Sequence, residues 1–86
     1  MKFTRHHLTI PPTGTTVVAI LEDETGAVHH VTVDAPAERQ ALLAATPMRS
    51  VFGQARERFR KARAGTEGRV FLMAERQFVK SLQAST

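Results

Sequence analysis

The stretch that decides the fold is TTVVAILEDETGAVHHVTVD, residues Thr15 to Asp34. Its two halves, residues 15–22 and 27–34, are rich in β-branched side chains, which favour strands. Between them, residues 23–26 (DETG) form a polar turn sequence with a glycine available for a positive φ. The pattern predicts an antiparallel β-hairpin over residues 15–34.

Alternation along the two strands assigns their side chains to two faces. One predicted face carries Val18, Ile20, His29, Val31 and Val33. The other predicted face carries Val17, Ala19, Leu21, Val28 and His30. Both faces are partly apolar, so we expect one to pack on helices. The other is left for a neighbouring strand, the C-terminus or a second subunit.

Further elements are predicted on both sides of the hairpin. Residues 3–10 favour a first strand, which ends at the PPTG sequence of residues 11–14. Residues 36–45 favour a short helix with Asp34 as its N-cap and a proline in its first turn. Thr46-Pro47 is expected to end this helix and to begin the next one.

The strongest helical pattern is PMRSVFGQARERFRKARA, residues 47–64. At about 100° per residue, its apolar residues form one core-facing stripe. The stripe consists of Met48, Val51, Phe52, Ala55, Phe59 and Ala62. Residues 65–68 (GTEG) predict a break in the helix.

Residues 69–83 favour a second helix, because their apolar residues keep a helical period over the whole segment. The repeating residues are Phe71, Ala74, Phe78 and Leu82. The alternative is a strand over residues 69–73 that joins the sheet, followed by a helix from Ala74.

Together these elements predict an α+β fold: an antiparallel sheet of two or three strands, followed by two or three helices packed on one face. The chain of 86 residues suits a single small domain over residues 1–86. Residues 1–34 are rich in β-structure, and residues 35–86 are mostly helical and basic. A domain this short buries a modest fraction of its surface, and the chain has no cysteine to cross-link it. We therefore consider a homodimer, or burial against a partner, a reasonable expectation.

The whole chain has a formal charge of +4, and its positive charge is concentrated in the second half. Residues 1–46 hold three basic and five acidic residues, whereas residues 47–86 hold nine basic and three acidic residues. Such asymmetry points to a polyanionic or acidic partner for the helical half. The alternative is that the arginines keep a solvated helix soluble, with their stems lying over the core.

Nine basic residues of the helical half are candidate binding residues, because arginine in particular binds phosphate or carboxylate groups with two hydrogen bonds. One flank of the 47–64 stripe carries Arg49, Arg56, Arg60 and Arg63. The other flank carries Arg58, and the outer face carries Lys61. A possible second row consists of Arg69, Arg76 and Lys80. Our first hypothesis is a non-enzymatic module that contacts a nucleic-acid backbone, DNA or RNA, with little sequence readout.

A protein-interaction module is the alternative hypothesis. The same arginines would dock on an acidic or nucleic-acid-binding surface of a larger protein, as a small inhibitor or accessory factor of a phage or mobile element would. A helix-turn-helix of residues 36–45 and 47–64 is a weaker hypothesis, because its two-residue joint is shorter than the usual turn.

Motifs for catalysis and for cofactor binding are missing from the sequence. It has no cysteine nucleophile, no glycine-flanked serine and no phosphate-binding glycine loop. The adjacent pairs His6-His7 and His29-His30 point to opposite faces of a strand, so each pair offers at most one ligand to a metal site. The acidic residues 22–24 cluster at one turn instead of converging from separate elements. We expect neither enzymatic activity nor a metal or cofactor.

Membrane insertion is not expected either. No segment approaches the roughly 18 apolar residues of a membrane span, and residues 1–12 lack the apolar run of a secretory signal. Together with the absence of cysteine, these features favour a cytoplasmic location.

Overall fold

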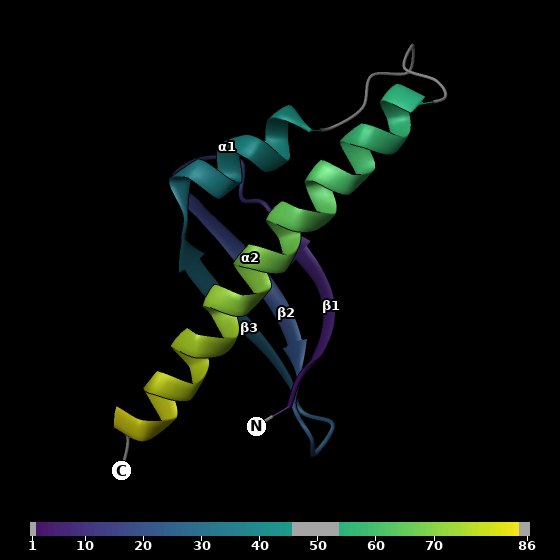
Figure 1. Cartoon of the computed structure of the whole chain (residues 1–86). Helices are drawn as coiled ribbons and strands as arrows, with labels where there is room; N and C mark the ends of the chain where they lie inside the picture. The colour runs from purple at the N-terminus through teal and green to yellow at the C-terminus, as the bar shows by residue number, and fades with distance from the viewer. Residues whose placement is uncertain (1, 46–53, 85–86) are drawn as a thin grey trace.

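The computed structural model describes residues 2–45 and 54–84, with residues 54–59 described by their helical backbone alone. Three strands are followed by two helices: β1 (Thr4–Thr9), β2 (Thr16–Glu22), β3 (Val28–Asp34), α1 (Pro36–Ala44) and α2 (Gln54–Ala84). The strands form one antiparallel sheet in the order β1-β2-β3. Both helices cover the same face of this sheet (Figure 1). The predicted α+β class and the predicted first strand are confirmed.

The turn between β2 and β3 determines which side chains share a face. The backbone N–H of Asp23 donates to the carbonyl of Ala27 at 2.9 Å, and that of Gly26 donates to the carbonyl of Asp23 at 3.1 Å. Gly26 has a φ of 88°, as the last residue of a three-residue hairpin loop requires. This loop pairs Val17 with Val33, Ala19 with Val31 and Leu21 with His29.

The observed pairing corrects the predicted faces. The odd-numbered residues of β2, not Val18 and Ile20, share the helix-facing side with the odd-numbered residues of β3. The physical reason is the odd number of loop residues, because a loop shorter or longer by one residue exchanges the faces of one strand relative to the other.

The core lies between this side of the sheet and the two helices. Its fully buried side chains include Leu21, Leu42, Val17 and Val70. Leu42 of α1 packs with Val17 and Val70, while Phe71 and Ala74 of α2 pack with the residues of β2 and β3. Ala35, not Asp34, is the N-cap of α1. The Asp34 side chain accepts a hydrogen bond from the Thr15 hydroxyl instead.

Helix α2 is a single helix of 31 residues. At 1.5 Å per residue it is about 46 Å long, roughly twice the length of a seven-residue strand. The predicted break at residues 65–68 is therefore wrong, whereas the helix predicted over residues 69–73 is confirmed. The glycines at 65 and 68 are tolerated because Thr66 and Val70 beside them are buried, and packing outweighs the low helix propensity of glycine.

The two ends of α2 extend beyond the sheet (Figure 1). Apolar residues near these ends, which the sequence predicted to face the core, are therefore exposed. Of the stripe predicted over residues 47–64, Ala62 is the member whose side chain is described, and it is exposed. Leu82, predicted for the second stripe, is also exposed. The predicted helix start at Thr46-Pro47 lies outside the described residues.

We expect Gly65→Ala and Gly68→Ala each to raise the free energy of unfolding by about 0.5–1 kcal/mol. A Cβ atom added at either position meets no other atom within 4 Å, and alanine restricts the unfolded chain. Urea unfolding followed by circular dichroism measures the effect. Gly26→Ala is the control and should destabilise, because its φ is positive. Destabilisation by alanine at 65 or 68 would contradict a continuous α2.

Candidate nucleic-acid interface

The predicted basic residues lie on or near α2, and the structure describes six of their side chains. Arg49 lies outside the described residues. Arg56 and Arg58 belong to the helical backbone of α2, but their side chains are outside the description. Arg63 is half-buried, whereas the exposed side chains are those of Arg60, Lys61, Arg69, Arg76 and Lys80.

The continuity of α2 separates the two predicted rows. Arg60 and Arg69 are nine residues apart, which is about two and a half helical turns, so they lie on opposite sides of the helix. Arg76 and Lys80 follow Arg69 after seven and eleven residues, or about two and three turns, and return to its side. We call Arg69, Arg76 and Lys80 the outer row. A flat polyanion contacts one row or the other, not both together.

Local contacts further distinguish the rows. Nε of Arg63 donates to Oε1 of Glu67 at 2.8 Å, an ion pair one helical turn long. This pair is partly exposed to solvent and contributes little stability, but it offsets positive charge on the Arg63 side of the helix. In the outer row, Arg69 donates to the Thr66 hydroxyl at 3.1 Å. That contact uses one of its five N–H donors, and no acid among the described side chains forms an ion pair with Arg69.

Glu75 is the acidic residue nearest in sequence to Arg76. Its negative charge is neutralised by an ion pair with Arg5 of β1. Nε and Nη2 of Arg5 donate to the two carboxylate oxygens of Glu75 at 3.0 and 2.9 Å. The Arg5 guanidinium also lies 5.6 Å from the centre of the Phe71 ring. The hydrogen bonds with Glu75 raise the pKa of Arg5 above its ordinary value. Glu75 therefore does not cancel the charge of the outer row.

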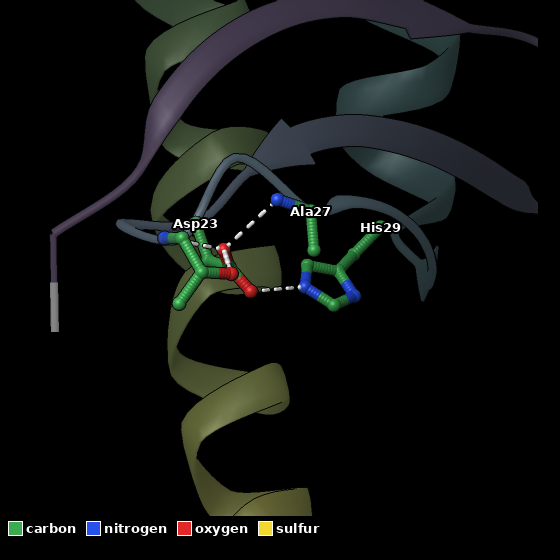
Figure 2. Close-up of polar contacts among 4 residues, drawn as sticks. Asp23, Ala27 and His29 are labelled. Carbon is green, nitrogen blue, oxygen red and sulfur yellow. Dashed lines mark hydrogen bonds and ion pairs between the residues drawn. The ribbon is translucent and has the colours of Figure 1, made fainter.

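A second set of contacts forms at the β2–β3 turn, around Asp23 (Figure 2). Its Oδ2 atom accepts a hydrogen bond from Nε2 of His29 at 2.7 Å. Its Oδ1 atom accepts from the backbone N–H of Thr25 at 2.8 Å, from the Thr25 hydroxyl, and from the backbone N–H of Ala27 at 3.1 Å. These bonds, above all those from His29 and the Thr25 hydroxyl, hold the pKa of Asp23 well below its ordinary value.

Aromatic contacts connect this turn to α2. The ring centres of His29 and Phe78 are 4.5 Å apart, and Phe3 meets Phe78 edge-on at 5.6 Å. Phe78 therefore joins the turn, the N-terminal segment and the helix in one cluster. Because Phe78 lies between Arg76 and Lys80 in sequence, the cluster fixes the orientation of the outer row relative to the sheet.

The acidic residues of the turn each have a partner of their own. Glu22 contacts Nε2 of His6 at 2.9 Å, and Glu24 accepts from the backbone nitrogen of Lys2 at 2.7 Å. Within residues 2–45 and 54–84, no three histidines or acids lie close enough together to hold a metal ion.

Sequence reasoning did not identify the Asp23–His29 contact or the Arg5–Glu75 pair. An aspartate two residues before a threonine is a local turn signal, and it could have indicated that Asp23 accepts hydrogen bonds within the turn. Arg5 and Glu75 are 70 positions apart, and no local pattern connects them.

No protein-family model, curated protein or solved structure matches this chain. In the described part of the chain, neither helix combines the length and the apolar character that crossing a bilayer requires.

We expect Asp23→Asn to destabilise the protein at pH 6 and to do so progressively less as the pH falls below about 4. The folded-state pKa of Asp23 lies below its unfolded-state value. The stabilisation it gives is thus present above the unfolded-state pKa and is lost as the pH falls toward the folded-state pKa. Urea unfolding of both proteins between pH 6 and pH 2 measures the difference.

Thr25→Ala serves as the comparison, because it removes one Oδ1 contact and keeps the His29 contact. We expect a smaller difference over the same pH range. A difference between wild type and Asp23→Asn that stays constant from pH 6 to pH 2 would refute a depressed pKa.

Proposed function

We propose that this protein is a small, non-enzymatic binding module that contacts a nucleic-acid backbone through the outer row of α2. The observation that carries the proposal is the exposure of Arg69, Arg76 and Lys80 on one side of a long helix. The neighbouring acids Glu67 and Glu75 are engaged by arginines outside the outer row, Glu67 by Arg63 of the same helix and Glu75 by Arg5 of β1. The outer row is therefore a site of net positive charge.

The spacing of the outer row suits several phosphates. Arg69 and Lys80 are eleven residues apart, so they span about 16 Å along the helix axis. A nucleic-acid strand advances about 3.4 Å per nucleotide along the duplex axis. The row thus matches a length of about five nucleotides, and each side chain can meet a different phosphate.

The composition of the row favours contact without base recognition. Its members are cations, which position a protein on the backbone but carry little sequence information. The described aromatic residues pack elsewhere: Phe71 is buried in the core, and Phe3 packs against Phe78. Among the described side chains, these aromatic rings form no exposed stacking platform of the kind on which single-strand binders rely, and we infer a sequence-tolerant contact.

We expect Arg69→Ala combined with Arg76→Ala to weaken binding to duplex DNA by about tenfold. The slope of log affinity against log salt concentration should become shallower by about two, because each lost phosphate contact contributes about 0.9. Fluorescence anisotropy with labelled duplex DNA, single-stranded DNA and RNA, between 50 and 300 mM salt, measures both quantities. The matched control is Arg60→Ala combined with Arg63→Ala, which removes the same charge from the other side of α2.

Equal losses in the two double variants would show that overall charge alone drives the binding, and would overturn the role of the outer row. Absence of binding at the lowest salt would reject the nucleic-acid function. The second hypothesis from the sequence, docking of the arginines on an acidic protein surface, would then be favoured.

A further inference from the structure

Strand β3 forms one edge of the sheet, and its edge is more regular than that of β1. Among the described strands, the order β1-β2-β3 leaves β3 with one neighbour, β2. The register of β1 shifts between Arg5 and His7, a bulge of the kind that bends an edge away from further pairing. By contrast, β3 pairs with β2 without interruption from Val28 to Asp34 and contains neither glycine nor proline.

The hydrogen bonds around β3 show which backbone groups point outward. The carbonyl of Thr32 accepts a hydrogen bond from the side-chain amide of Gln77 at 2.7 Å, so this carbonyl points away from β2. Ala35, three residues later, donates its N–H inward to the carbonyl of Thr15. Because the N–H and C=O of one strand residue point the same way, His30 and Thr32 present both groups at the edge.

A groove runs along the C-terminal half of α2. It reaches β3 at Val33 and Asp34 and the N-terminal segment at Lys2 and Phe3. On the helix its lining includes Met73, Arg76, Gln77 and Lys80. Residues 80–84 of α2 are exposed, and the yellow end of the helix passes beyond β3 (Figure 1). The groove thus combines apolar side chains from the sheet and the helix with two cations from the outer row.

We propose that this edge takes an extended, acidic segment of a partner protein as a fourth strand. The segment would bond to the outward backbone groups of His30 and Thr32 and place apolar side chains on Val33 and Met73. Its carboxylates would meet Arg76 and Lys80. The Gln77 side-chain amide donates to the Thr32 carbonyl, as a backbone N–H of such a strand would. It therefore satisfies this edge carbonyl until the partner strand displaces it.

The charge of the groove favours an acidic partner over a second copy of this chain. Of the two acids that line the groove, Asp34 bonds to Thr15 and Glu75 is paired with Arg5. A second copy would carry a formal charge of +4 and bring its own Arg76 and Lys80 toward the same cations. This inference does not require nucleic-acid binding, because its main contact is the backbone of β3, but the two sites share Arg76 and Lys80.

A labelled, end-blocked peptide of sequence VTETVTET tests the proposal with the full chain. When it is extended, valine and glutamate alternate on one face and threonine fills the other. We expect saturable binding by anisotropy, and slower hydrogen exchange at the amides of His30 and Thr32 by NMR. The control peptide VTKTVTKT should bind about tenfold more weakly, since its charges repel Arg76 and Lys80.

Three variants locate the binding site. Thr32→Pro removes an N–H that points away from β2, and proline is tolerated at this position of an edge strand. The loss of this donor should weaken peptide binding about tenfold. Thr32→Val keeps the N–H and is the control. Gln77→Ala frees the Thr32 carbonyl and should tighten binding about threefold. Arg76→Glu combined with Lys80→Glu should reverse the preference toward the lysine peptide.

The proposal is overturned if the glutamate peptide fails to bind, or if both peptides bind equally to the wild type. It is also overturned if sedimentation shows that the wild type alone dimerises and that Thr32→Pro abolishes the dimer, because a second copy would then occupy the edge. Should Thr32→Pro not fold, the Gln77 and charge-reversal variants still decide the outcome. Duplex DNA binding should persist in Thr32→Pro, which separates this site from the proposed nucleic-acid contact.

Discussion

The hydrogen-bonded turn between β2 and β3 is the constraint on which the rest of the structure depends. Its three loop residues place Val17, Ala19 and Leu21 on the same face as the apolar residues of β3. That face is the only one of the two that both helices cover in the described residues. A register one residue different would turn half of these side chains away from α2. The position of α2, and therefore of its arginines, follows from the geometry of a single loop.

Much of the fold was predictable because its signals are local. The β-branched runs around the DETG turn, and the helical period of Phe71, Ala74 and Phe78, each lie within one element. The strand faces were not predictable from alternation alone. Alternation assigns the faces of each strand separately, and only the hydrogen bonds of Asp23 and Gly26 fix the number of loop residues that relates the two strands.

The continuity of α2 could not be predicted for a different reason. Glycines at 65 and 68 are local signals for a break. They are overruled by the burial of Thr66 and by the packing of Val70 with Val17 and Leu42, which are distant in sequence. The same error affects the candidate site. With a break, the two basic rows could face one partner together; with one straight helix, Arg60 and Arg69 lie on opposite sides. The basic residues of the site were evident from the sequence, but the side of the helix on which each one lies was not.

The two proposals place different ligands on neighbouring parts of one element. The outer row lies on the exposed side of α2, while the groove lies where the same helix passes the edge of β3. Arg76 and Lys80 belong to both. A carboxylate and a phosphate would compete for these two cations, whereas Arg69 and the backbone of Thr32 each belong to one site. Occupation of the groove should thus weaken, but not abolish, contact of the outer row with a polyanion.

The ion pair between Arg5 and Glu75 has a consequence for the order of folding. Its partners are 70 positions apart in a chain of 86 residues, whereas the β2–β3 hairpin closes over a handful of residues. During synthesis the hairpin can form early, and Leu8 of β1 can pack against Val17 and Leu42 before α2 has emerged. The ion pair of Arg5, however, must wait until Glu75 has been made. Local contacts form fast and distant ones slowly. The attachment of β1 to the helix is therefore a late event, and the newly made chain must keep its exposed sheet in solution until then.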